Sequence, residues 1–413
     1  MRIFEQLESE VRSYVRSFPV IFDTAEGSFL FDEQGNRYID FFSGAGTLNY
    51  GQLILYLHLL LLFHNTLYLY IFLQKFYDTV LAPRNLEYKI QFTGPTGTNA
   101  VESALKLARM VKGRSNVIAF TNAFHGLTMG ALAVTGNNFY RDEFFGMRSN
   151  VDHMPYDGYF GPDVNTIEYL RRFLEDKSSG IDLPAAIIVE TVQGEGGIHV
   201  ASVEWLQQLE QLCHEFDILL IVDDIQVGNG RTGTFFSFER AGIKPDMVTL
   251  SKSIGGGLPL ALLLMRPELD QWKPGEHTGT FRGNNLAFVA STEALAYWDN
   301  EDLAESVKYK GQIMEEELTK IRDKYPQLEA DVRGVGMVWG LEIKKLGFAG
   351  EVSKAAFENG LVIELSGAED QVIKFLPSLV IDEDTLREGI GIIDKAIGEL
   401  LERKQEMRTG DVM

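Results

Sequence analysis

The stretch ILLIVDDIQVGNGRTG, residues 218–233, decides the fold. Its apolar start is typical of a buried strand, and it runs directly into two carboxylates, Asp223 and Asp224, and then into a glycine-containing turn. In mainly parallel sheets, ligands lie beyond the carboxyl ends of the strands, so an acid in this position is placed to meet a ligand. Taken alone, the stretch is explained equally well by an acid that caps the following turn.

Further strands and helices alternate on both sides of this stretch. From about residue 98, helical patterns such as NAVESALKLARMV alternate with the short apolar runs NVIAFT, AAIIVE, DMVTLS and LALLLM. Short apolar runs between helices indicate an α/β fold with a mainly parallel sheet that is covered on both faces. We expect a large domain over 51–310 and a small α+β domain over 311–413, to which residues 1–50 contribute an N-terminal part.

Composition and charge restrict the class of protein. The chain has 413 residues, of which 45% are hydrophobic and 23% charged, as in ordinary globular proteins. A formal net charge of −21 repels phosphates, so we expect no binding to nucleic acid. The single cysteine, Cys213, cannot form an internal disulfide, and the start of the chain lacks a secretory-signal pattern. These features predict a cytoplasmic protein.

Residues 53–73, LILYLHLLLLFHNTLYLYIFL, break the pattern. Their length permits a membrane span. His58, His64 and Asn65 lie in the middle, however, and no basic flank marks an orientation, so we expect no span. The stretch also lacks the spacing of an amphipathic helix. A third interpretation is that this part of the sequence is itself aberrant.

A second motif, SKSIGGGLP at 251–259, places Lys252 between a strand end and a glycine cluster. A desolvated lysine has a lowered pKa, and its amine becomes a nucleophile toward carbonyl groups. An ordinary surface lysine is the commoner explanation of such a residue on its own.

A third motif, GPTGTNAVESALKLAR at 94–109, opens a helix after a glycine-rich turn. The free N–H groups of Gly97, Thr98 and Asn99 predict an anion site, which is compatible with a simple N-cap by Thr98 or Asn99.

Three weaker motifs complete the set. AFHGLT at 123–128 offers Phe124 for stacking on a flat ring, VETVQGEGG at 189–197 carries Glu190 and Glu195, and HTGTFRGNN at 277–285 offers the hydroxyl of Thr280. Each is more often structural when it occurs alone. Together, the motifs supply an anion cradle, a stacking ring, an acid for a ring nitrogen and a nucleophilic lysine. This is the set that pyridoxal 5'-phosphate (PLP), a phosphate-bearing aromatic aldehyde, requires.

The chain resembles the class III aminotransferases of PLP fold type I over residues 20–51 and 75–400. The resemblance is carried by IVDDIQVGNGRTG and TLSKSIGGGLP, in which Lys252 follows Asp223 by 29 residues. It implies a seven-stranded, mainly parallel sheet in the large domain, PLP as cofactor, and a homodimer or larger oligomer with shared active sites. The motifs are most similar to the subgroup of ectoine biosynthesis. That subgroup converts L-aspartate 4-semialdehyde and L-glutamate to L-2,4-diaminobutyrate and 2-oxoglutarate.

The resemblance also implies a role for each matching residue. Lys252 would hold PLP as a Schiff base and move the proton, and Asp223 would keep the ring nitrogen protonated. The other cofactor contacts would be Gln226 to the phenolic oxygen, Phe124 to the ring face, Gly97 and Thr98 to the phosphate, and Thr280 to the phosphate of the neighbouring subunit. Glu195 would switch between the two substrates, with Glu190 in a supporting role. No metal ligands are implied.

The chain departs from the family pattern at several positions. Asp224 stands where the family usually has glutamate, and Lys374 where many members have an arginine for a substrate carboxylate. Lysine cannot make the planar bidentate pair, which leaves Arg282 as a second candidate for that carboxylate. Residues 52–71 replace a longer polar region.

Three alternative functions stay open. They are another ω-amino acid aminotransferase acting on 4-aminobutyrate, ornithine or acetylornithine, an aminomutase, or an inactive protein of the same fold.

Overall fold

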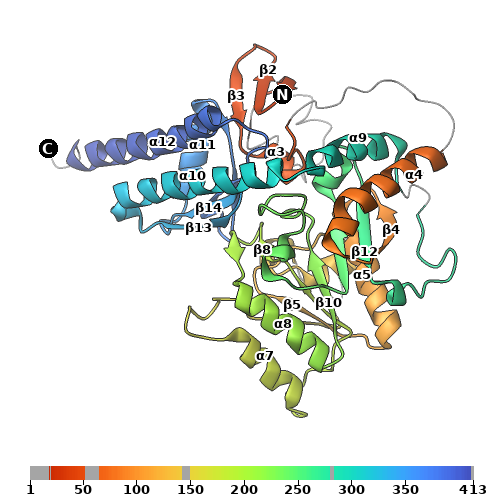
Figure 1. Cartoon of the computed structure of the whole chain (residues 1–413). Coiled ribbons are helices and arrows are strands. Elements are labelled where there is room, and N and C mark those ends of the chain that lie inside the picture. Colours follow the sequence, from red (N-terminus) through yellow and green to blue (C-terminus); the bar gives the residue numbers. More distant parts are fainter. Residues whose placement is uncertain (1–17, 19, 52–64, 142–148, 280–282, 411–413) are drawn as a thin grey trace, which may run out of the picture. The chain divides into compact units, whose positions relative to one another are not determined.

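The structure is a computed structural model that describes residues 18, 20–51, 65–141, 149–279 and 283–410 (Figure 1). The chain divides into two compact units. Residues Leu57–Lys308 form the larger unit, and Met1–Tyr56 together with Tyr309–Met413 form the smaller one.

A seven-stranded sheet forms the centre of the larger unit, with strand order β4-β12-β11-β10-β7-β5-β6. The strands are β4 (Lys89–Gly94), β5 (Val117–Phe120), β6 (Val151–Met154), β7 (Ala186–Val189), β10 (Leu219–Asp223), β11 (Met247–Leu250) and β12 (Ala261–Met265). All are parallel except β12, which runs antiparallel to both of its neighbours. The predicted α/β fold with a mainly parallel seven-stranded sheet is therefore confirmed.

Continuous apolar sequence explains the central strands, because β7, β10, β11 and β12 are buried along their whole length. Helix α5 (Gly97–Lys112) packs its apolar face on this sheet, with Val101, Leu105 and Ala108 in one cluster with Ile188 and Ile221. Burial of a side chain of this kind contributes roughly 1.5–3 kcal/mol. Helices α7 (Thr166–Glu175) and α8 (Val203–Glu215) lie side by side in the same unit (Figure 1).

The order of these strands positions the site. Strands β7, β10 and β11 are neighbours and run in one direction, so their carboxyl ends meet at one edge of the sheet. Glu190 directly follows β7, and Lys252 lies two residues beyond β11. Strand β10 ends at Asp223, and Asp224 follows it. A short antiparallel hairpin, β8 (Val192–Gln193) with β9 (His199–Val200), follows β7 at this edge.

Part of the unusual apolar stretch forms helix α4 (Asn65–Phe76) in the larger unit. Phe72 and Phe76 are fully buried, whereas Tyr70 and Ile71 are exposed, so this part of the stretch has one buried face. The ring of Phe72 stacks on that of Phe288 in helix α9 (Asn285–Leu295), with centroids 5.6 Å apart. Residues 52–64 lie outside the described part. Among the residues that are described, no helix combines the length and apolarity needed to cross a membrane.

The smaller unit contains two four-stranded sheets. The first has the order β1-β2-β3-β15, with β1 (Phe22–Glu26), β2 (Phe29–Asp32), β3 (Arg37–Asp40) and β15 (Leu361–Val362). The second has the order β13-β14-β17-β16, with β13 (Asp331–Val335), β14 (Val338–Glu342), β17 (Val372–Phe375) and β16 (Glu364–Ser366). Helices α10 (Asp302–Lys324), α11 (Phe348–Glu358) and α12 (Glu383–Gly410) complete the C-terminal part. The parallel pairing of β15 with β3 joins the N-terminal and C-terminal segments.

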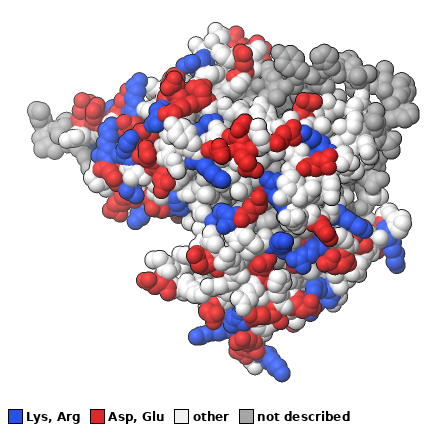
Figure 2. All heavy atoms as spheres, in the orientation of Figure 1, with Lys and Arg blue, Asp and Glu red and all other residues white. Residues whose placement is uncertain are grey.

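Acidic and basic side chains are interspersed on the face shown in Figure 2. The excess of acids in the sequence is therefore spread over the described surface on this face, and the expectation that the chain does not bind nucleic acid stays a prediction.

Candidate active site

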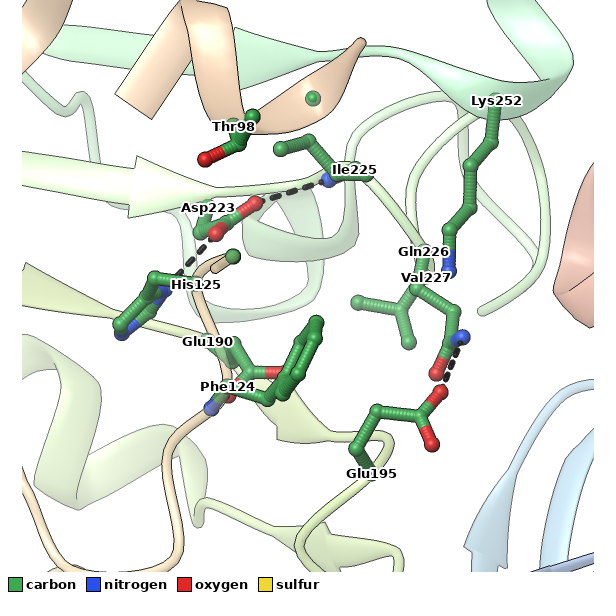
Figure 3. A pocket seen from close by; sticks show the side chains of 12 residues that line it. Thr98, Phe124, His125, Glu190, Glu195, Asp223, Ile225, Gln226, Val227 and Lys252 are labelled. Carbon is green, nitrogen blue, oxygen red and sulfur yellow. Dashed lines mark hydrogen bonds and ion pairs between the residues drawn. The ribbon is translucent and has the colours of Figure 1, made fainter. Parts of the chain in front are cut away.

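A cavity opens at the carboxyl edge of the large sheet, and all of its lining belongs to the larger unit (Figure 3). Its lining residues are Gly97, Thr98, Phe124, His125, Gly126, Glu190, Glu195, Asp223, Ile225, Gln226, Val227 and Lys252. The structure thus brings together eight of the residues that the sequence predicts for the site: Gly97, Thr98, Phe124, Glu190, Glu195, Asp223, Gln226 and Lys252.

Asp223 is held by hydrogen bonds to both of its carboxylate oxygens. Its Oδ2 lies 2.7 Å from Nδ1 of His125, and its Oδ1 accepts hydrogen bonds from Thr249 Oγ1 at 3.1 Å and from the Ile225 N–H at 3.2 Å. Burial alone lowers the pKa of His125, but the hydrogen bond and charge of Asp223 outweigh burial and raise it overall. The shift makes the imidazolium form of His125 more favourable than it is in a free histidine.

His125 lines the site although the sequence motifs predict no role for it. Its signal in the sequence is that it follows Phe124 directly in a loop after β5, a strand of the same parallel sheet as β10. Residues after parallel strands meet at one edge, so the loop and Asp223 are expected to be near each other. The specific pairing depends on the conformation of the loop, which the sequence pattern does not determine.

Glu190 connects two of the loops that line the cavity. Its Oε2 accepts a hydrogen bond from the Phe124 N–H at 3.0 Å, and its Oε1 accepts one from the Gly194 N–H at 3.3 Å. Burial raises the pKa of Glu190 to about 7, with the charge of Asp223 adding to the shift and that of His125 opposing it. Glu190 thereby ties the Phe124 segment to the hairpin that carries Glu195.

Glu195 and Gln226 face each other in the cavity (Figure 3), where Gln226 Nε2 donates to Glu195 Oε1 at 2.9 Å. A side chain at the position on either side of Glu195 would have to displace a neighbouring group. A Cβ on Gly194 would lie 1.7 Å from Gln226 Oε1, and a Cβ on Gly196 would lie 2.2 Å from the Asn122 carbonyl oxygen. The backbone beside Glu195 is therefore fixed by packing.

Lys252 begins a short 3₁₀ helix, Lys252–Gly255, just beyond β11. Its backbone has φ of 52°, in the left-handed region that non-glycine residues seldom adopt. Strained backbone of this kind persists only where the surroundings enforce it, and it concentrates at functional sites. The side chain lines the same cavity as Asp223 and Gln226 (Figure 3).

The start of α5 provides the candidate anion site. Thr96 is the N-cap residue, and Asn99 Oδ1 accepts hydrogen bonds from the Thr96 N–H at 3.2 Å and from its hydroxyl at 2.8 Å. The expectation that Thr98 or Asn99 is itself the N-cap is wrong, because the N-cap is Thr96, two residues before Thr98, and the helix starts at Gly97. Gly97 and Thr98 are thus in the first turn, where N–H groups lack intrahelical acceptors and face the cavity edge.

Four further residues were named from the sequence: Thr280, Arg282, Lys374 and Asp224. Thr280 and Arg282 fall outside the described residues. Lys374 is on β17 in the smaller unit, fully buried, with its Nζ 2.7 Å from Glu364 Oε2. Asp224 is also fully buried, and one of its oxygens accepts a hydrogen bond from the Ser237 N–H at 3.0 Å. Burial raises the pKa of Asp224 to about 7, although the hydrogen bonds from Ser237 act in the opposite direction.

Comparison with known proteins places the chain in a family. The family model for aminotransferase class-III matches residues 11–397, and the chain belongs to that family of enzymes. A diaminobutyrate–2-oxoglutarate transaminase of Wolinella succinogenes is 65% identical, with coverage of 100% of this chain and 99% of the relative. A protein of the same name from Bordetella parapertussis is 53% identical, with coverage of 98% and 97%.

A solved structure shows the same fold. The ornithine aminotransferase of Toxoplasma gondii superimposes with a TM-score of 0.79 at 25% identity, and the match covers 98% of this chain and 95% of the other. That protein is described as having PLP at partial occupancy in its active site. The predicted resemblance to class III aminotransferases of the PLP-dependent fold is therefore confirmed.

Proposed function

We propose that this enzyme uses PLP to transfer the amino group of L-glutamate to L-aspartate 4-semialdehyde, forming 2-oxoglutarate and L-2,4-diaminobutyrate. The observation that carries the PLP assignment is that Asp223 and Lys252 line one cavity, with Asp223 buried and held at both oxygens. The choice of substrates is supported by the names of full-length relatives at 65% and 53% identity.

The described residues fit this cofactor chemically. When bound, PLP supplies an electron sink that stabilises negative charge at the carbon next to the amino group. The buried Asp223 carboxylate is suited to keep a ring nitrogen protonated, and His125 fixes the orientation of that carboxylate. Phe124 lines the cavity as the candidate stacking ring, and the first turn of α5 at Gly97 and Thr98 is the candidate phosphate site.

Lys252 has two proposed tasks. Its amine would hold the cofactor covalently, and as a free amine it would move the proton that amino transfer requires. The unusual backbone at Lys252 fixes where the side chain starts, so both tasks are carried out from one anchored position.

Glu195 is the proposed switch between the two substrates. Its link to Gln226 holds a negative charge in the cavity, which is unfavourable for a substrate with a second carboxylate such as glutamate. Because the backbone on either side of Glu195 lies close to Gln226 and to the Asn122 carbonyl, the switch is proposed to be a rotation of the Glu195 side chain. Lys374 and Arg282 remain the candidates for binding the substrate carboxylate.

The further proposals rest on the family resemblance. They are a homodimer or larger oligomer in which Thr280 reaches the phosphate of the neighbouring subunit, a cytoplasmic location, and a place at the start of ectoine biosynthesis. A second candidate function is amino transfer from ornithine or a related ω-amino acid, which is favoured by the likeness to an ornithine aminotransferase.

The test is an assay of the purified protein with PLP, 2-oxoglutarate and one amino donor at a time. We expect glutamate to form fastest with L-2,4-diaminobutyrate, and more slowly with ornithine or 4-aminobutyrate. Faster turnover of ornithine would establish the second candidate instead. A reaction that proceeds without any 2-oxo acid would identify an aminomutase, and a PLP-loaded protein that is inactive with all donors would support the inactive alternative.

A further inference from the structure

A chain of hydrogen bonds lies behind the candidate phosphate site. Thr98 and Glu102 are four residues apart on α5 and therefore share one face of the helix. Thr128, immediately before helix α6 (Met129–Val134), bridges them, with its Oγ1 2.7 Å from Thr98 Oγ1 and 2.5 Å from Glu102 Oε1.

Close packing holds this chain in place. A Cβ on Gly126 would lie 2.5 Å from Thr98 Oγ1, and a Cβ on Gly130 would lie 2.3 Å from Glu102 Oε2, so the loop between these glycines is seated directly on α5. Glu102 Oε1 also accepts the N–H groups of Gly130 at 2.8 Å and Ala131 at 3.1 Å. The start of α6 is thus already satisfied by Glu102, whereas the start of α5 at Gly97 and Thr98 faces the cavity.

The direction of the hydrogen bonds follows from the donors. A carboxylate only accepts, so Thr128 donates its single hydroxyl hydrogen to Glu102. Thr128 Oγ1 can then only accept from Thr98, which means that the hydroxyl hydrogen of Thr98 points along the chain toward Thr128.

An anion at the start of α5 reverses part of this chain. To donate to a phosphate oxygen, Thr98 must turn its hydrogen away from Thr128, and Thr128 then donates to Thr98. Glu102 loses one donor but keeps the two backbone N–H groups of α6. A hydroxyl that accepts one hydrogen bond is a stronger donor of another, so Thr128 strengthens the contact of Thr98 with the anion.

We propose that Thr128, held in place by Glu102, is a positioning residue for the phosphate of the cofactor and acts through Thr98. Thr98 is the one member of the three that touches the phosphate. This inference rests on the proposed function, since it requires that PLP binds in this cavity.

The test compares Thr128→Val, which keeps the shape but removes the hydroxyl, with Thr128→Ser, which keeps the hydroxyl. PLP and its phosphate-free analogue pyridoxal are titrated into the cofactor-free protein, and the visible absorption of the lysine-bound form is followed. We expect Thr128→Val to weaken PLP binding about fivefold, the effect of losing one hydrogen bond, and to leave pyridoxal binding unchanged. Thr128→Ser should bind both within about twofold of the original protein.

A double-mutant cycle with Thr98→Ala tests whether Thr128 acts through Thr98. In the Thr98→Ala background, Thr128→Val should cause little further loss of PLP affinity, because the intermediary is gone. Glu102→Ala should also weaken PLP binding, by about fivefold or more, because it removes the acceptor of the two α6 N–H groups that hold Thr128 in place. Glu204→Ala, an exposed acid in the first turn of α8, is the matched control and should have no effect.

The inference is overturned if Thr128→Val binds PLP as tightly as the original protein, or if it loses pyridoxal affinity to the same extent. It is also overturned if the Thr98→Ala and Thr128→Val losses add in full. Failure of the proposed function has a different signature. In that case the unmodified protein itself shows no visible band with PLP and no preference for PLP over pyridoxal.

Discussion

Nδ1 of His125 lies 2.7 Å from Oδ2 of Asp223, and both side chains are buried at the carboxyl edge of the large sheet. The pair joins the Phe124 loop to the end of β10. Because Thr249 and the Ile225 N–H hold the other oxygen of Asp223, the carboxylate has a single fixed orientation toward the cavity.

Replacement of His125 is expected to impair catalysis more than cofactor binding. In His125→Ala, Asp223 loses the partner that orients and balances its charge, and we expect kcat to fall about 10- to 100-fold, the scale of losing a supporting hydrogen bond at a catalytic centre. His125→Asn, which can still donate to Asp223, should retain more activity. The measurement is kcat together with PLP affinity, and exposed His214→Ala is the control. A kcat of His125→Ala equal to that of His214→Ala would show that the pair has no catalytic importance.

Asp224 is expected to make stability depend on pH. Its pKa of about 7 in the folded state exceeds the ordinary value of 3.8, so the folded protein keeps a proton that the unfolded chain releases between these values. The contribution of Asp224 to stability is therefore full below pH 3.8 and is lost as pH rises through 7. Each unit of pKa difference corresponds to about 1.4 kcal/mol of unfolding free energy.

Asp224→Asn tests this dependence, because the amide mimics the protonated acid. Relative to the original protein, the variant should gain unfolding free energy steadily from pH 4 to 7 and show no further gain above that range. Denaturant unfolding at several pH values measures the difference, with the exposed Asp163→Asn as control. A difference that stays constant with pH would mean that Asp224 is ionised in the folded protein.

Gly194→Ala tests the packing beside Glu195. The new Cβ would collide with Gln226 Oε1 and push Gln226 away from Glu195, so we expect a loss of activity of at least tenfold while the protein still folds. The control is Gly391→Ala in α12, where a Cβ meets nothing within 4 Å and alanine favours the helix by roughly 0.5–1 kcal/mol. Steady-state kinetics and the midpoint of thermal unfolding should be measured together. Normal activity of Gly194→Ala would contradict a fixed Gln226–Glu195 contact.

Variants of Lys374 show whether this residue has a structural role or binds the substrate. Lys374→Met leaves Glu364 without its buried partner, and we expect the unfolding free energy to fall by about 3 kcal/mol. The double change Lys374→Met with Glu364→Leu should recover most of that loss, because the half-buried Glu364 carboxylate no longer faces an apolar side chain in place of its ammonium partner. If the double variant folds normally and its KM for glutamate is unchanged, the prediction that Lys374 binds a substrate carboxylate is wrong. A KM raised at least tenfold would support it.

The sequence predicted the class of fold and most of the cavity lining because both depend on local patterns. Continuous apolar runs ending in Asp223 or followed closely by Lys252 predict strands of a mainly parallel sheet, and parallel strands place their next residues at one edge. The eight predicted residues that meet in the cavity end a strand, follow one, or lie in the first turn of a helix.

What the sequence could not predict depends on the conformations of loops. His125 pairs with Asp223, and Thr128 bridges Glu102 to Thr98, only because the loop after β5 folds back onto α5 and β10. These contacts join residues 26 to 98 positions apart and carry no periodic signal. The N-cap of α5 was misplaced for a related reason, since Thr96, Thr98 and Asn99 are all residues that favour helix starts.

The central claim is that Lys252 is the catalytic lysine of an aminotransferase that acts on diaminobutyrate. Its most direct test is the rate of glutamate formation from L-2,4-diaminobutyrate and 2-oxoglutarate, for the PLP-loaded protein and for Lys252→Ala side by side. The account predicts steady formation by the original protein and a loss of at least about 10⁴-fold in the variant, as expected when covalent and acid–base catalysis are removed together. Equal rates in the two proteins, or no glutamate from the original protein above an enzyme-free control, would contradict it.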